Sequence, residues 1–316
     1  MAVAARGYKK DAPSPRSSSP GPAVTGCIAV LGTGRLGSAI ARRLASRGHR
    51  LVLWNRTPGR AQALAGEIGA RVASSPREAA EQCSYVHIVV SDDEASLQVL
   101  AGERGVASGP LDGRIVYNHT TVTPGHSLAA ESLVSRTGGV YAEAPVAGGP
   151  RNALEGRLVV LCGSRSSEAC GAPHLHDLGE VVYLGEPPRA SAAKLAFNLS
   201  FLSIVAGLGE AFALAEAYGV GAEVLVREVL GRTWLKTIIE RYGERLWPRG
   251  EASFTAKLAG KDARYAFEAL SAAGLPGGVA AAVADHYALM DMMGYGEEDY
   301  PSIAGFLARL ARRGQG

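Results

Sequence analysis

The stretch that decides the fold is Cys27-Ile-Ala-Val-Leu-Gly-Thr-Gly-Arg-Leu-Gly-Ser-Ala-Ile-Ala-Arg-Arg-Leu-Ala-Ser-Arg47. It opens with a short apolar run, typical of a buried strand, and it ends with the helical spacing of Ser38 to Arg47. Between them Gly32-Thr-Gly-Arg-Leu-Gly37 fits the pattern G-x-G-x-x-G. The first glycine permits a tight turn, the second lets a pyrophosphate approach the backbone, and the third lets helix and strand pack closely. Because an anion then meets free N–H groups at the helix start, the stretch predicts a dinucleotide-binding turn. The alternative is a glycine-rich turn without a ligand.

The chain on either side of this stretch divides into three parts. Strand and helix patterns alternate as far as residue 184, which predicts right-handed crossovers and a parallel sheet. Further strands are expected at 50–54, 71–73, 85–90, 114–117 and 140–143, and the strands at 158–162 and 181–184 are expected to extend the same sheet. After Pro187-Pro188 only helical patterns follow. The sequence therefore predicts a Rossmann-type doubly wound α/β domain over 26–188 and an all-α domain over 189–316. Residues 1–25, rich in Pro and Ser, are expected to form a mobile tail, with a transit peptide or a basic arm as alternatives.

Composition excludes several classes of protein. A net charge of +3 over 316 residues is too small to indicate nucleic-acid binding by the whole chain. No uninterrupted apolar run reaches the roughly 18 residues that span a bilayer, so the apolar stretch from Phe197 to Leu214 is interpreted as a core helix and no membrane partner is expected. The cysteines show no C-x-x-C spacing, which favours buried free thiols in a reducing cytoplasm. They are Cys27, Cys83, Cys162 and Cys170.

A second motif concerns the choice of cofactor. About twenty residues after the glycine loop, an NAD enzyme usually presents an acid to the ribose hydroxyls. This chain has Asn55-Arg-Thr57 at that place. Arg56 is suited to a 2′-phosphate, and Asn55 and Thr57 add neutral donors. The sequence thus favours NADP, unless Arg56 is only a solvated residue at a helix start.

With these residues placed, the chain from Gly26 onward resembles the β-hydroxyacid dehydrogenase family, which includes 3-hydroxyisobutyrate dehydrogenases, tartronate semialdehyde and glyoxylate reductases, and the related imine reductases. Five motifs in the family's order carry the resemblance. They are the glycine loop, Asn118-His-Thr-Thr-Val-Thr-Pro124, Ala144-Pro-Val-Ala-Gly-Gly149, Lys194-Leu-Ala-Phe-Asn198 and Lys261-Asp262.

The resemblance implies a role for each motif. It makes Lys194 the catalytic proton-transfer residue. Substrate binding falls to Thr120, Gly148, Gly149 and Asn198. Cofactor contacts fall to Gly32, Thr33, Gly34, Arg35, Leu36, Gly37, Asn55, Arg56, Thr57, Val89, Val90, Thr121 and Lys261. Simpler readings stay open: the threonines can satisfy their own turn, the valines can be core, the glycines can form a plain turn, and Lys261 can form a surface ion pair with Asp262.

Two departures from the family pattern bear on the substrate. Asn118 stands where the family has Asp, as in many imine reductases, and Ala147 stands where it has Ser. Against an imine reductase, Lys194 occupies the place that those enzymes fill with Asp or Tyr. The predicted activity is hydride transfer between NADP and a small β-hydroxy acid or its aldehyde or keto acid. An imine reductase and a catalytically silent NADP-binding interaction protein are the alternatives.

Two further expectations complete the prediction. By resemblance, the helical domains are expected to pair in a homodimer or homotetramer. His174 and His176 lack a second ligand cluster, so they are interpreted as part of a solvated loop and no metal is expected.

Overall fold

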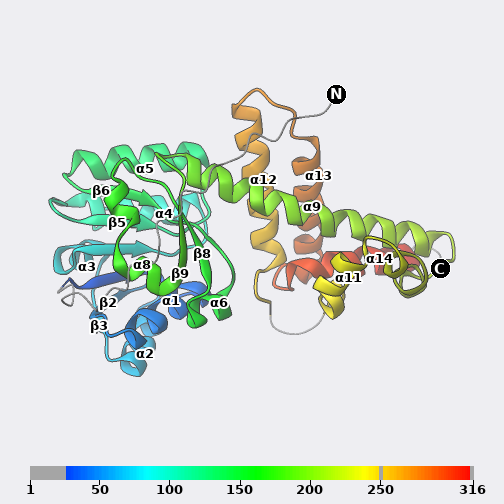
Figure 1. Cartoon of the computed structure of the whole chain (residues 1–316), viewed down its shortest axis with the longest axis horizontal. Coiled ribbons are helices and arrows are strands. Elements are labelled where there is room, and N and C mark those ends of the chain that lie inside the picture. The colour runs from blue at the N-terminus through cyan, green and yellow to red at the C-terminus, as the bar shows by residue number, and fades with distance from the viewer. Residues whose placement is uncertain (1–25, 249–251, 314–316) are drawn as a thin grey trace, which may run out of the picture.

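The computed structural model describes residues 26–248 and 252–313, and the tail predicted over residues 1–25 lies outside them. An α/β part and a helical part stand side by side, and one long helix runs from the first into the second (Figure 1). The predicted fold class, a Rossmann-type sheet followed by an all-α domain, is confirmed.

The first part is built on a six-stranded parallel sheet in the order β3-β2-β1-β4-β5-β6. Because β1 pairs with both β2 and β4, the strand order reverses beside β1, and the carboxyl ends of β1 and β4 open the crevice where such sheets bind ligands. The strands are β1 (Ile28–Leu31), β2 (Leu51–Trp54), β3 (Arg71–Val72), β4 (Tyr85–Ile88), β5 (Ile115–Asn118) and β6 (Val140–Glu143). The helices between them are α1 (Arg35–Ser46), α2 (Pro58–Ile68), α3 (Pro76–Gln82), α4 (Asp93–Ala101) and α5 (Pro124–Arg136).

The expectation that later strands extend this sheet is wrong. After Pro145 the chain forms a separate three-stranded sheet, in which β7 pairs antiparallel and β9 pairs parallel with β8. Its only ladder contact with the first sheet, among the described residues, is the bridge between Glu143 and Gly163. The elements are β7 (Val146–Ala147), β8 (Leu158–Cys162), β9 (Gly179–Tyr183), α6 (Pro150–Glu155), α7 (Ser167–Cys170) and α8 (Pro173–Leu178).

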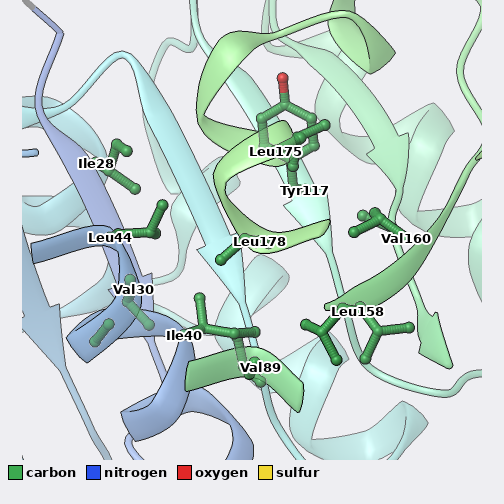
Figure 2. Packing of buried hydrophobic residues seen from close by; sticks show 14 of the residues in the cluster. Ile28, Val30, Ile40, Leu44, Val89, Tyr117, Leu158, Val160, Leu175 and Leu178 are labelled. Carbon is green, nitrogen blue, oxygen red and sulfur yellow. The ribbon is translucent and has the colours of Figure 1, made fainter. Parts of the chain in front are cut away.

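Apolar side chains from both sheets fill one continuous core. Helices α1, α6 and α8 pack against each other and cover this face, so that Ile40 and Leu44 of α1 belong to the same cluster as Leu158 and Val160 of β8 (Figure 2). Val89, which directly follows β4, lies in the same cluster. The core therefore fixes the strand ends that face the crevice.

The second part consists of helices around α9 (Arg189–Ala217), which packs on α12, α13 and α14. By length and apolar composition α9 is the one described helix that meets the criteria for a membrane span. Its residues Leu202, Val205 and Phe212 are buried inside the helical part, which favours the interpretation as a core helix. The other helices are α10 (Ala222–Val224), α11 (Lys236–Tyr242), α12 (Ala256–Ala272), α13 (Gly278–Met290) and α14 (Ile303–Arg313). Short turns of 3₁₀ type (Leu230–Arg232, Gly243–Leu246, Tyr300–Ser302) and π type (Leu225–Val229, Asp291–Tyr295) link these helices, and a further 3₁₀ turn (Val106–Ser108) follows α4 in the first part.

The cysteines are not the free thiols that the sequence suggested. Cys27 pairs with Cys83, with Cα atoms 4.5 Å apart, and Cys162 pairs with Cys170 at 5.7 Å. Cys27 and Cys83 precede the neighbouring strands β1 and β4, which brings together two residues that are far apart in the sequence. The spacing of cysteines alone could not show this.

The prediction of a solvated loop around His174 is also wrong. Helix α8 turns His174 inward together with Leu175 and Leu178, and its side chain packs 5.0 Å from the ring of His87. His87 in turn hydrogen-bonds His119, with 2.8 Å between Nδ1 and Nε2. Within residues 26–248 and 252–313 there is no cluster of His, Cys, Asp or Glu that suits a metal ion.

Candidate active site

A cleft of about 2260 Å³ lies where the carboxyl ends of β1, β4 and β5 face helices α9 and α12. Most of the predicted site residues line it. Thr33 lines a smaller hollow that adjoins it, and Thr57 lines neither. The sequence motifs thus converge on one space between the two parts of the chain.

Each position of the loop requires glycine for a different steric reason. Gly32 has a φ of +107°, and a Cβ there would collide with the carbonyl oxygen of Val89. A Cβ on Gly37 would collide with the carbonyl oxygen of Gly32. Gly34 has no atom within 4 Å of such a position, so its backbone is open to a ligand. This is the division of roles that a pyrophosphate-binding turn requires.

The helix after the loop offers an anion site. Helix α1 begins at Arg35 with no side-chain hydrogen bond to its N-cap Gly34 and no acid in its first turn. Its first N–H groups and the positive end of its dipole point toward the loop. The residues therefore fit the pyrophosphate of a nicotinamide dinucleotide.

The residues of the Asn55-Arg56-Thr57 segment have different roles. The Asn55 side chain accepts the N–H of Thr33 at 3.0 Å and donates to the carbonyl of Thr57 at 3.0 Å. Asn55 thus fastens the glycine loop to the end of β2. Arg56, which lies before α2, is exposed on the cleft wall, and Arg60 in the first turn of α2 lines the same wall. Arg60 was not among the predicted residues, because it lies outside the Asn55-Arg56-Thr57 motif.

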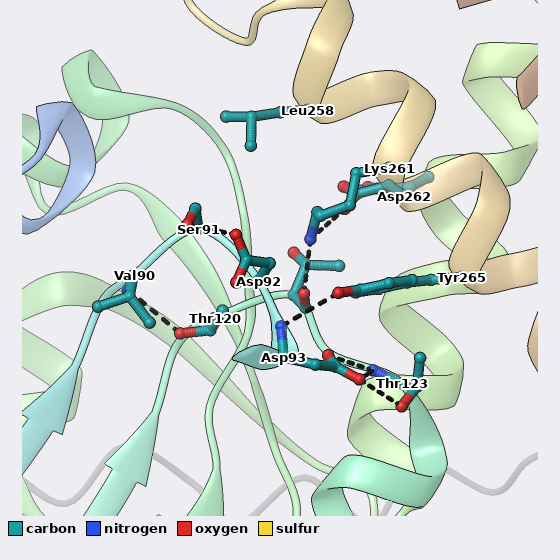
Figure 3. Close-up of polar contacts among 12 residues, drawn as sticks. Val90, Ser91, Asp92, Asp93, Thr120, Thr123, Leu258, Lys261, Asp262 and Tyr265 are labelled. Atoms are coloured by element: carbon teal, nitrogen blue, oxygen red, sulfur yellow. Dashed lines mark hydrogen bonds and ion pairs between the residues drawn. The ribbon is translucent and has the colours of Figure 1, made fainter. Parts of the chain in front are cut away.

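At the ends of β4 and β5 the structure joins two predicted pairs (Figure 3). The hydroxyl of buried Thr120 accepts the N–H of Val90 at 3.2 Å, which leaves its own proton for another acceptor. The carbonyl of Thr121 accepts a hydrogen bond from Lys261 Nζ at 2.8 Å. Lys261 therefore reaches from α12 to the nucleotide-binding part and is no ordinary surface residue.

Helix α12 is held to the strand ends by more than this lysine. The Tyr265 hydroxyl accepts the N–H of Asp93 at 3.1 Å, and the Asp93 carboxylate accepts the Thr123 hydroxyl at 2.6 Å (Figure 3). Lys261 Nζ also lies 2.8 Å from Asp262 Oδ1 as an ion pair. The sequence motifs did not include Tyr265 or Asp93, because Tyr265 contacts Asp93 across 172 positions and Asp93 contacts Thr123 across 30 positions of the sequence.

Lys194 and Asn198 lie one turn apart on α9 and both face the cleft. Burial by the surrounding protein lowers the pKa of the Lys194 ammonium to about 8, an effect that Asp262 opposes and Lys261 increases. Buried Asn198 donates from Nδ2 to Asp262 Oδ2 at 2.5 Å, and its Oδ1 is buried without a partner. A lysine whose pKa is lowered to about 8 thus stands beside an amide oxygen that has no hydrogen-bond partner.

The two departures from the family pattern have different surroundings. Asn118 is buried, where it donates to Ser96 Oγ at 2.9 Å and accepts the N–H of Thr120 at 3.1 Å, so it shapes the turn. In the Ala147–Gly149 segment, Gly148 lines the cleft with a φ of +125°. The N–H of Gly149 is taken by Asn152 Oδ1 at 3.0 Å, which removes one of the two amides expected to bind substrate.

Comparison with known proteins agrees with this geometry. Residues 27–185 match the family described as the NAD binding domain of 6-phosphogluconate dehydrogenase, and residues 189–307 match the one described as NAD-binding of NADP-dependent 3-hydroxyisobutyrate dehydrogenase. The chain belongs to the β-hydroxyacid dehydrogenase family. Members of this family are nicotinamide-dependent oxidoreductases, so the bound cofactor is a nicotinamide dinucleotide.

Individual relatives and solved structures show what the chain is similar to. It is 28% identical to glyoxylate/succinic semialdehyde reductase 2, chloroplastic, of Arabidopsis thaliana over 87% of this chain and 78% of that protein. Its fold is similar to that of the Mycobacterium tuberculosis 3-hydroxyisobutyrate dehydrogenase solved with L-serine, with a TM-score of 0.76, 21% identity and coverage of 89% and 99%. A reductive aminase from Aspergillus terreus shares the fold with a TM-score of 0.57, 23% identity and coverage of 89% and 99%.

Proposed function

We propose that the protein is an NADP-dependent reductase or dehydrogenase that acts on a carbonyl acid and the corresponding hydroxy acid. The observation that carries the proposal is the position of Lys194, which lines the same cleft as the glycine loop and has a pKa lowered to about 8. A bound nicotinamide would supply or accept the hydride.

The chemistry assigned to the chain itself is proton transfer. When a carbonyl carbon gains a hydride, negative charge builds on its oxygen, and an acid within hydrogen-bond reach stabilises it. In this proposal the Lys194 ammonium gives that proton during reduction, and the neutral amine takes it back during oxidation. Asn198, with its unpaired Oδ1, orients either the ammonium or a substrate hydroxyl. Asp262 positions Asn198 through the 2.5 Å hydrogen bond.

The preference for NADP is supported by two arginines on the cleft wall. Arg56 and Arg60 are exposed next to the end of β2, and no acid stands at the position where NAD enzymes bind the ribose hydroxyls. Guanidinium groups are well suited to a phosphate. We therefore propose the 2′-phosphate site between Arg56 and Arg60.

The experiment that tests the proposal is a substrate panel. NADPH oxidation is measured with glyoxylate, succinic semialdehyde and a cyclic imine, beside NADP⁺ reduction with hydroxy acids and L-serine. Turnover of the carbonyl acids in preference to the imine supports the proposal. Turnover of the imine alone favours an imine reductase, and no turnover of any compound favours a silent NADP-binding protein.

One observation bears on the imine alternative. Asn118 is the residue that suggested an imine reductase, and its side-chain amide forms hydrogen bonds with Ser96 and Thr120 inside the protein. Its amide therefore gives no reason to expect an imine substrate, while Lys194 suits a carbonyl oxygen.

We also propose a homodimer or homotetramer joined through the helical part. Large apolar side chains are exposed there, including Trp234, Tyr218, Leu214, Val279 and Met292. Exposed apolar patches on such a surface mark association sites.

A further inference from the structure

Beyond Lys194, aromatic side chains of α9 line the cleft and form what we call the aromatic wall. Lys194, Phe197, Asn198 and Phe201 recur with the spacing of helical turns, and all four line the cleft. The Lys194 Nζ lies 5.3 Å from the centroid of the Phe197 ring, and the centroids of Phe197 and Phe201 are 5.2 Å apart.

The wall extends onto the opposite elements of the helical part. Tyr300 lies 5.1 Å from Phe201 and 5.5 Å from Phe254, and both Tyr300 and Phe254 line the cleft. Aromatic rings offer a large apolar contact area, and ligand pockets of this kind take an apolar body. An acid of two to four carbons would leave most of this wall in contact with water.

The wall ends at a fixed guanidinium. Arg245 lies 5.4 Å from the Tyr300 ring, donates from Nε to Asp299 Oδ2 at 2.8 Å, and donates to Ser253 Oγ at 3.2 Å. Because a guanidinium carries five N–H donors, these two bonds leave others for a ligand. Arg241 lines the cleft nearby, and within the described part of the chain its guanidinium makes no ion pair. Because Arg245 is paired with Asp299, Arg241 is the guanidinium at this end whose charge no ion pair among the described residues offsets.

At the Lys194 end of the cleft, few hydrogen-bond donors are available to a carboxylate attached next to the reacting carbonyl carbon. The N–H of Gly149 is taken by Asn152, and Ala147, which carries no hydroxyl, does not line the cleft as its neighbours Val146 and Gly148 do. A substrate whose carboxylate is attached next to its carbonyl therefore loses two expected partners.

We infer that the substrate is a carbonyl compound with an apolar or aromatic body and a carboxylate remote from the carbonyl. The carbonyl lies at Lys194, the body lies against Phe197, Phe201 and Tyr300, and the carboxylate binds Arg241 and Arg245. In the reduction the carbonyl carbon gains a hydride from NADPH and its oxygen gains a proton, which yields the alcohol and NADP⁺. This inference rests on the proposed function, since it takes Lys194 as the residue that meets the carbonyl.

The test compares two aldehydes that share one long apolar body, nonanal and 9-oxononanoate, with glyoxylate as a third substrate. Since a charged hydrogen bond is strong, kcat/KM for 9-oxononanoate should exceed that for nonanal by about tenfold or more. Arg241→Gln should lower this ratio at least about fivefold, as it removes a guanidinium without exposing Asp299. Arg264→Gln, which changes a cleft-lining arginine on α12 outside the aromatic wall, is the matched control and should leave the ratio unchanged.

The possible results distinguish a failure of the remote carboxylate site from a failure of the proposed function. If glyoxylate or nonanal is reduced but the ratio of the two kcat/KM values is close to one, or if Arg241→Gln leaves this ratio unchanged, the remote carboxylate site is wrong and the proposed function stands. If no carbonyl compound is reduced with NADPH, both are overturned.

Discussion

The buried histidines predict a loss of stability in acid that can be worked out from the structure. Burial lowers the pKa of His174 to about 3 and that of His119 to about 4, and it holds the pKa of His87 well below its usual value. At the rim of the cluster, His49 Nε2 lies 2.7 Å from Asp177 Oδ2, and Asp177 also pairs with Arg47. Desolvation is the main cause of the three shifts, because a charged imidazole has no water in this core.

The sign follows from where the protons bind. Below pH 6.5 the unfolded chain protonates these histidines and the folded chain does not, so stability is present above that pH and is lost as the pH falls toward 4 and 3. One pKa unit corresponds to about 1.4 kcal/mol, so at pH 5 each buried histidine costs about 2 kcal/mol of the free energy of unfolding. His174→Gln should therefore reduce the stability difference between pH 7.5 and pH 5 by about 2 kcal/mol.

The assay is urea unfolding followed by tryptophan fluorescence at the two pH values. The comparison uses the difference between pH values, so any general destabilisation by the substitution cancels. His176→Gln, an exposed histidine on the same helix, is the matched control and should keep the parent's difference. If His174→Gln and the parent lose the same stability within about 0.5 kcal/mol, the account of the cluster as neutral and desolvated is refuted.

Three other predictions follow from the cleft and the helical part. Arg56→Ala should raise the KM for NADP about tenfold and leave that for NAD unchanged, because only NADP carries the 2′-phosphate; equal changes with both cofactors in steady-state kinetics would place Arg56 elsewhere. Ala147→Ser should lower the KM for glyoxylate up to about tenfold by restoring one charged hydrogen bond, and an unchanged or higher KM would show that Ala147 is not at the carboxylate. The exposed Trp234 and Tyr218 predict that light scattering at micromolar concentration gives at least the mass of a dimer, so a monomer would contradict the proposed interface.

Local features of the chain could be predicted from the sequence. The glycine loop and the alternation of strands and helices depend on neighbouring residues, so their patterns are visible in the sequence and the structure places them as expected. The spacing of Lys194 and Asn198 likewise predicted a shared helical face.

Features that depend on distant residues could not be predicted. The pairing of Cys27 with Cys83 follows from the adjacency of β1 and β4, and the burial of His174 follows from the contacts of its ring with aromatic side chains of β4 and β5. The hydrogen bond between Asn198 and Asp262 joins two helices 64 positions apart. In each case the pattern showed the residue types, and only the fold showed their partners.

The central claim is that Lys194 transfers the proton, and one comparison tests it most directly. The kcat of Lys194→Ala is measured with saturating NADPH and the best carbonyl acid of the panel, with nucleotide fluorescence to follow cofactor binding. General acid catalysis typically contributes about 10²–10⁴-fold, so kcat should fall by that factor while cofactor binding is kept. Lys257→Ala removes another cleft-lining lysine and should change kcat less than about threefold. In the parent, reduction should slow as the pH rises through about 8, where Lys194 loses its proton. A loss of less than about tenfold in Lys194→Ala would contradict the assignment of Lys194 and with it the proposed mechanism.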